Sequence, residues 1–239
     1  SSRMYATVMP ELAELGYDVI ALDLLGYGRS DPRPEQWSME MWADNVHEAM
    51  EQLCTRPVTA VGGHSGACVV TEIALRHPDA VENVILDGCP LPTPELTKTF
   101  AAMRQNSRPG PTADLGHEAL VFRTVRTTYE HYVPGFTVTP QTIEAIWPAM
   151  IDYLETDFVS SAPISVSYDL AARLPQIRQP LALLSATTDT LFGNHARACT
   201  LAATAQQHVF EGHHPLHDPA RCREYAQVIA RFSDRRRVL

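Results

Sequence analysis

A short glycine-rich stretch constrains the fold of this 239-residue chain more than any other feature. The stretch covers residues 63–67 and reads Gly-His-Ser-Gly-Ala, between an apolar run at 58–61 and a helix-like run at 68–75. A tight connection from a strand to a helix needs small residues two positions before and two positions after its central residue, because the backbone folds back on itself there. The spacing therefore predicts that Ser65 stands exposed at the centre of the turn, as in a nucleophile elbow.

A serine at such a turn would have a defined chemical surrounding. The backbone N–H of Gly66 would point to the place where an oxyanion forms, so Gly66 is the predicted oxyanion-hole residue. A glycine-rich turn between a strand and a helix can also bind a phosphate or serve packing alone. The rest of the chain has to separate these interpretations.

Apolar runs alternate with helical patterns on both sides of the turn. The predicted strands are short apolar runs at 17–22, 58–61, 81–86, 181–185 and 208–210. The predicted helices have apolar residues at helical spacing and lie at 4–15, 38–53, 68–75, 196–205 and 218–233. This alternation predicts an α/β fold with a mostly parallel sheet that helices cover on both faces. Sites in such sheets form at the carboxyl ends of the strands, where Ser65 and Asp87 are expected to lie.

The alternation stops between residues 91 and 176. Helical patterns follow one another in this segment without a convincing strand between them. We therefore predict a core made of residues 1–90 and 177–239, with residues 91–176 inserted as a helical cap. A few side chains should line a pocket, and the candidates are His64, Trp147 and Phe192.

The composition argues against several classes of function. A net charge of −9 argues against nucleic-acid binding, because proteins that bind nucleic acids carry positive charge for the phosphates. No apolar stretch reaches the length of a membrane span and no signal peptide opens the chain, so the expected location is cytoplasmic. No residues have the spacing of metal ligands, and neither a metal nor a cofactor is expected. The expected partner is a small-molecule substrate, and the sequence does not indicate an oligomeric state.

A serine hydroxyl becomes an effective nucleophile only when a histidine accepts its proton and an acid orients that histidine. Asp189 and His213 each follow a late predicted strand, and the order serine, aspartate, histidine is the one that the elbow predicts. The predicted catalytic residues are therefore Ser65, Asp189 and His213. Two alternatives stay open, because Asp87 follows another strand and is an alternative acid, and because His214 is an alternative base beside His213.

These residues together resemble the α/β-hydrolase superfamily, in the capped branch of epoxide hydrolases, haloalkane dehalogenases, C–C hydrolases and esterases. Residues 23–31 match the Asp-x-x-Gly-x-Gly-x-Ser-Asp loop of that branch, the elbow matches with Ala67 in place of the commoner glycine, and residues 212–219 resemble a shortened histidine loop. The resemblance implies the α/β-hydrolase fold with a helical cap. The family begins with further strands and a His-Gly loop that supplies a second oxyanion donor, so we expect that an upstream segment belongs to this protein.

The resemblance also implies the type of chemistry. Relatives in this branch that act on epoxides and haloalkanes use an aspartate nucleophile, whereas a serine suits acyl transfer. We expect a serine hydrolase that cleaves an ester, thioester, lactone or amide of a small, moderately apolar substrate through an acyl-enzyme. The alternatives are a C–C bond hydrolase or lyase with the same triad, and a homologue that binds a ligand without catalysis.

Overall fold

The computed structural model describes most of the chain outside the expected cap. The described residues are 1–34, 36–91, 93, 98, 113–116, 118–120, 122–123, 126, 130, 140, 147, 152 and 164–233. Most of the helical cap expected at 91–176 lies outside the described residues, so the division into core and cap stays a prediction.

The sheet of the described part contains four parallel strands in the order β1-β2-β3-β4. The strands are β1 (Val58–Gly63), β2 (Val81–Asp87), β3 (Leu181–Ala186) and β4 (Gln206–Phe210). The register places Gly63 opposite Asp87, and Asp87 opposite Leu184. Because parallel strands end at the same edge of a sheet, the turn after β1, the end of β2 and the loop after β3 lie together. The predicted parallel α/β architecture is confirmed.

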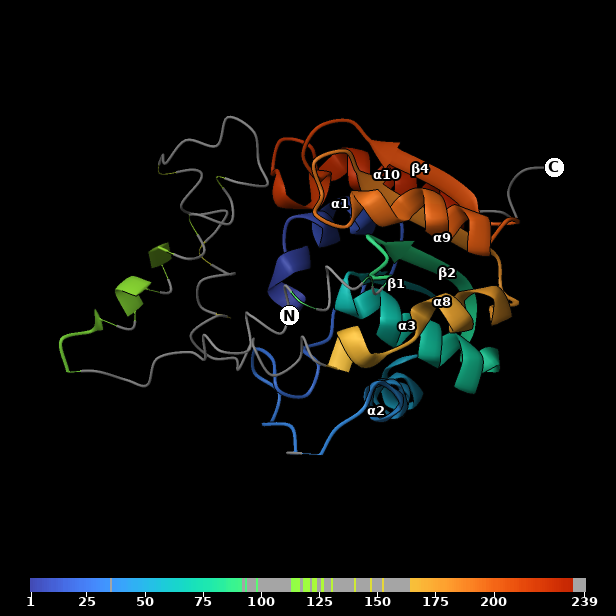
Figure 1. Cartoon of the computed structure of the whole chain (residues 1–239), viewed down its shortest axis with the longest axis horizontal. Helices are drawn as coiled ribbons and strands as arrows, with labels where there is room; N and C mark the ends of the chain where they lie inside the picture. The colour runs from blue at the N-terminus through green and yellow to red at the C-terminus, as the bar shows by residue number, and fades with distance from the viewer. Residues whose placement is uncertain are drawn as a thin grey trace.

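Helices connect these strands, as Figure 1 shows. The α-helices whose bounds the structure describes are α1 (Val8–Glu14), α2 (Met39–Leu53), α3 (Ser65–Arg76), α8 (Leu170–Arg173), α9 (His195–Leu201) and α10 (Cys222–Ser233). The short 3-10 helices are η1 (Ser2–Tyr5), η2 (Pro78–Ala80), η3 (Leu174–Gln176), η4 (Phe192–Asn194) and η5 (Pro215–His217). Among the described residues, no helix combines the length and the apolar character needed to cross a membrane.

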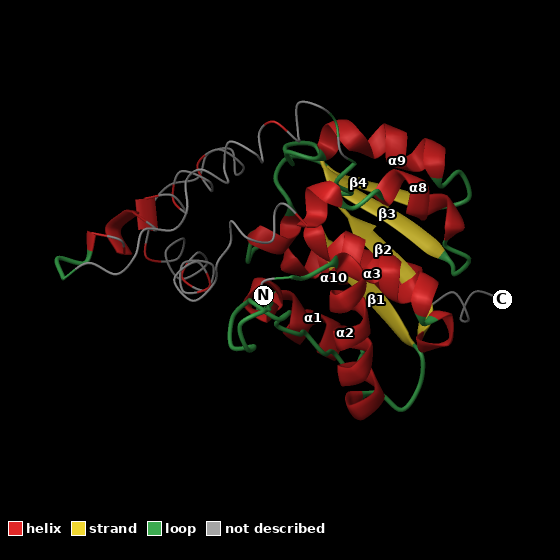
Figure 2. Ribbon diagram, turned by 60° about the horizontal axis from the view of Figure 1, so that its bottom comes forward, coloured by secondary structure: helices red, strands yellow, loops and turns green. Residues whose placement is uncertain are grey.

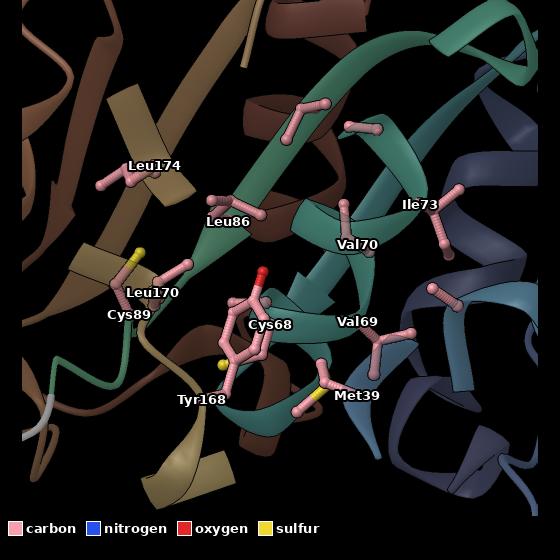
Figure 3. Packing of buried hydrophobic residues seen from close by; sticks show 14 of the residues in the cluster. Met39, Cys68, Val69, Val70, Ile73, Leu86, Cys89, Tyr168, Leu170 and Leu174 are labelled. Carbon is pink, nitrogen blue, oxygen red and sulfur yellow. The ribbon is translucent and has the colours of Figure 1, made fainter. Parts of the chain in front are cut away.

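The helices cover both faces of the sheet (Figure 2). Side chains of α2, α3, α8 and α9 share one buried cluster with Leu86 and Leu183, and side chains of α1 and α10 share a second cluster with Ile85 and Leu184. Neighbouring residues of one strand point to opposite faces, so β2 and β3 contribute to both clusters. Figure 3 shows the first cluster, in which Leu86 lies among the side chains of α3 and α8.

The strand predicted at residues 17–22 is absent from the described structure, in which these residues form no regular element. A strand needs a neighbouring backbone for its hydrogen bonds, and β1 pairs with β2 alone in the described part of the chain. Ile20 is 49% exposed, whereas Tyr17 packs on the cluster of α1 and α10. The apolar pattern at 17–22 was therefore a wrong signal for a strand.

Candidate active site

The turn between β1 and α3 is centred on His64. This residue has φ 50° and ψ −116°, a left-handed backbone that costs a non-glycine residue of order 1–3 kcal/mol. A Cβ on Gly62 would lie only 2.2 Å from the carbonyl oxygen of Gly66, so the two backbones are in direct contact. The chain thus folds back between Gly62 and Gly66, and His64 stands midway between them.

This geometry corrects the predicted position of Ser65 in the turn. Ser65 is the first residue of α3, one position beyond the centre. In the described part of the chain, no hydrogen bond joins its hydroxyl to a histidine. The prediction took Gly63 and Ala67 as the two small residues, yet a Cβ on Gly63 would meet nothing closer than 3.8 Å. The pair of Gly62 and Gly66 centres the turn on His64, and the pair of Gly63 and Ala67 would centre it on Ser65. Both pairs consist of small residues, so their spacing in the sequence does not decide which residue is at the centre.

The carboxylate of Asp189 holds the side chain of His64. Asp189 lies in the loop after β3, and its Oδ2 is 2.8 Å from His64 Nε2. Its Oδ1 accepts the N–H of Leu191 at 2.6 Å. The same edge of the imidazole packs on Gly88, where an added Cβ would come within 2.6 Å of the ring. The predicted acid therefore has an imidazole partner, but the partner is His64 and not His213.

Desolvation and pairing change the pKa values of Asp189 and His64 in opposite directions. Burial raises the pKa of Asp189, but the hydrogen bond and the charge of His64 lower it by more, so its pKa lies below the ordinary value. Partial desolvation of the ring lowers the pKa of His64, but the hydrogen bond to Asp189 and the charge of Asp189 raise it by more, so its pKa lies above the ordinary value. Each group thus favours the charged form of the other.

The alternative acid and the alternative base form a second pair. Asp87 Oδ2 is 2.6 Å from His214 Nε2, and both side chains are buried. The hydroxyl of Tyr225, on α10, donates to the same oxygen at 2.8 Å. Burial raises the pKa of Asp87, but the charge of His214 and the hydrogen bonds from His214 and Tyr225 outweigh it and hold the pKa below its usual value.

In this arrangement His214 has no ring nitrogen free to accept a proton from a substrate or a nucleophile. His214 Nδ1 accepts the N–H of Leu216 at 3.2 Å, so both of its ring nitrogens have protein partners. His213 also has its own partner, since its Nε2 is 2.7 Å from Asp218 Oδ2. The predicted combination of His213 with Asp189 is therefore not the pairing that the structure shows.

The remaining predicted residues have simpler positions. Gly66 lies in the first turn of α3, where the backbone N–H groups have no carbonyl ahead of them in the helix. Phe192 is half-buried beside the Asp189 loop, where its N–H donates to the Asp189 carbonyl at 3.0 Å. Trp147 is 52% exposed, so its place in a pocket stays a prediction. Within the described residues, no group of three or more potential ligands is arranged to hold a metal ion.

Comparisons with known proteins agree with this fold. Residues 1–114 match the family model described as the alpha/beta hydrolase fold. The chain has the α/β-hydrolase fold. An esterase from Exiguobacterium antarcticum superposes on this chain with a TM-score of 0.77 at 18% identity, over 97% of this chain and 87% of that one. A bromoperoxidase from Bacillus anthracis superposes with a TM-score of 0.75, also at 18% identity, over 97% of this chain and 87% of that one.

Curated relatives match a shorter part of this chain. The 2-hydroxymuconate semialdehyde hydrolase of Pseudomonas sp. (strain CF600) is 35% identical over 82 residues, which are 34% of this chain and 29% of that protein. A haloalkane dehalogenase of Mycolicibacterium paratuberculosis is 32% identical over 119 residues, which are 48% of this chain and 40% of that protein. The matches thus span well under half the length of these relatives.

Proposed function

We propose that this protein is a hydrolase that cleaves an ester-type bond of a small, moderately apolar substrate at the turn between β1 and α3. The observation that carries the proposal is the imidazole of His64, held 2.8 Å from Asp189 at the centre of that turn. Turns of this kind expose a reactive side chain above the sheet. The esterase and the semialdehyde hydrolase among the similar proteins support a hydrolytic reaction.

The first turn of α3 would bind the oxyanion of the reaction. The N–H groups of Ser65 and Gly66 lie at the N-terminus of a 12-residue helix, where the helix dipole favours negative charge. An ester carbonyl that approaches His64 develops its negative charge beside these donors. In this proposal Asp189 keeps its predicted role as the orienting acid, and His64 replaces His213 as the imidazole that it orients.

A panel of p-nitrophenyl esters of increasing chain length tests the proposal, with Asp189→Asn as the decisive variant. Loss of the orienting carboxylate should lower kcat/KM by about 10²- to 10⁴-fold, in line with the loss of the acid that holds a catalytic imidazole in position. Asp218→Asn is the matched control, because Asp218 also holds a histidine through a carboxylate oxygen, at 2.7 Å. We expect this control to retain activity within about threefold, because Asp218 pairs with His213 and not with His64.

The opposite pattern would reject the assignment. If Asp218→Asn loses activity and Asp189→Asn keeps it, the pair of His213 and Asp218 carries the reaction. If the folded wild-type protein binds esters without turning them over, the protein is better described as a homologue that binds a ligand without catalysis.

Cleavage of a C–C bond is the second candidate function. It is favoured by the 35% identity, over 82 residues, to an enzyme named 2-hydroxymuconate semialdehyde hydrolase. Product analysis with a vinylogous acid or a β-diketone beside the ester panel separates the two reactions, because each gives a different pair of products. Turnover of the C–C substrate alone would replace the ester proposal.

A further inference from the structure

We propose that His64, and not Ser65, is the residue that becomes covalently acylated in the reaction. This inference rests on the proposed ester-type hydrolysis and names the attacking group. It assigns a catalytic role to a side chain that the sequence interpretation treated only as a possible pocket residue.

The backbone supplies the first argument. The left-handed conformation at φ 50° belongs to His64, and Gly62 and Gly66 make the close approach on its two sides. A histidine in this conformation is strained, and such strain persists where the surrounding structure fixes it, often at reactive groups. Ser65 has no such conformation and begins the regular helix.

The state of the imidazole supplies the second argument. Its Nε2 faces Asp189 and Gly88, which leaves Nδ1 on the opposite edge of the ring. In the described part of the chain no hydrogen bond reaches Nδ1, and 52% of the side chain is exposed. An imidazolium has no lone pair, so the attacking form is the neutral imidazole, which prevails above the raised pKa of His64. In this form Nε2 carries the proton that points to Asp189, and Nδ1 carries the lone pair. His213 and His214 lack this arrangement, because the first pairs with Asp218 and the second uses both nitrogens.

The reaction then has two balanced steps. The lone pair of His64 Nδ1 forms a bond to the carbonyl carbon, the C–O bond of the ester breaks, and its electron pair leaves with the alkoxide, which takes a proton from water. The acyl-imidazolium is cationic, and the Asp189 carboxylate compensates its charge. The hydroxide left by that water then adds to the acyl carbon, and the C–N electron pair returns to Nδ1.

An activated carbamate tests this assignment, because a carbamoyl group on a catalytic residue hydrolyses slowly enough to be found. We would treat the 239-residue protein with p-nitrophenyl dimethylcarbamate and map the adduct by fragmentation mass spectrometry of the peptide that contains residues 64 and 65. The carbamoyl group should lie on His64 in the wild type and in Ser65→Ala. His64→Asn should carry no adduct, and asparagine is chosen because it tolerates positive φ better than most residues.

His77→Gln is the matched control for histidine chemistry. His77 also binds a carboxylate at 2.8 Å, that of Asp44, but it lies at the end of α3 far from the turn. This variant should be carbamoylated on His64 as fast as the wild type. Circular dichroism of each variant identifies any loss of fold.

Two results would overturn the inference: an adduct on Ser65, or a folded wild-type protein with no adduct at residue 64. Ester turnover without an adduct on His64 would reject the acyl-imidazole and leave the proposed function standing. An adduct on His64 without turnover of any ester in the panel would reject the proposed function and keep the reactive imidazole.

Discussion

At the scale of single residues, Asp87 shows how a buried charge is held in place beside the turn. Its carboxylate receives hydrogen bonds from His214 and Tyr225, and its backbone carbonyl accepts the N–H of His64 at 2.8 Å. Asp87 therefore connects His214, through its side chain, to His64 at the centre of the turn, through its backbone. Hydrogen bonds to charged groups contribute about 1.5–3 kcal/mol each to the free energy of unfolding, so the loss of either donor to Asp87 should destabilise the fold.

Tyr225→Phe removes one of these donors and keeps the ring. We expect the free energy of unfolding to fall by about 1.5–3 kcal/mol, because the buried carboxylate loses a partner at 2.8 Å. The pKa of Asp87 should rise, since the lost bond favoured the charged form. Urea denaturation measures the first effect. Tyr17→Phe is the control, because the hydroxyl of Tyr17 donates to the uncharged backbone carbonyl of Ala230 at 3.4 Å. Equal losses in the two variants would contradict the argument.

At the scale of elements, the close contact between β1 and α3 requires a residue without a side chain at position 62. A methyl group on Gly62 would lie 2.2 Å from Gly66 oxygen, a backbone atom that cannot move without the helix. Gly62→Ala should therefore destabilise the fold by about 1–3 kcal/mol or more, as other overpacked sites do. Thermal unfolding followed by circular dichroism measures the change.

Gly66→Ala is the paired experiment for that turn. An added Cβ at Gly66 would meet nothing within 4 Å, and alanine favours a helix over glycine by roughly 1 kcal/mol. This variant should be as stable as the wild type or more stable. A similar loss in both variants would show that the close approach between β1 and α3 does not limit the turn.

At the scale of the whole molecule, three paired groups should shape the pH dependence of stability. Asp87 and Asp189 have lowered pKa values, so their contribution is fully present above about pH 4 and is lost as the pH falls through the lower folded values. His64 has a raised pKa, so its contribution is present below about pH 6.5 and is lost as the pH rises through its folded value.

The free energy of unfolding should therefore be largest between about pH 4 and pH 6.5 as far as these groups determine it. Urea denaturation across pH 3 to 9 measures the profile. Asp189→Asn should flatten the decline on the alkaline side, because His64 loses the partner that raises its pKa. An unchanged alkaline limb in this variant would disprove the role of the pair.

The sequence by itself determined the features that depend on neighbouring residues. Apolar runs and helical spacing predicted the four strands of the sheet and the helices between them, and the small residues predicted a tight turn after β1. The strand expected at 17–22 failed, because a strand also requires a partner backbone that local sequence does not reveal.

Only the tertiary structure decided which residue stands at the centre of the turn and which carboxylate holds which histidine. The turn register depends on the contact of Gly62 with Gly66, and the sequence offered another small pair one residue later. The paired histidines and aspartates are up to 127 positions apart in the sequence, so their pairing depends on how the strand ends meet. A difference of one residue in the register exchanges a hydroxyl for an imidazole at the centre of the turn.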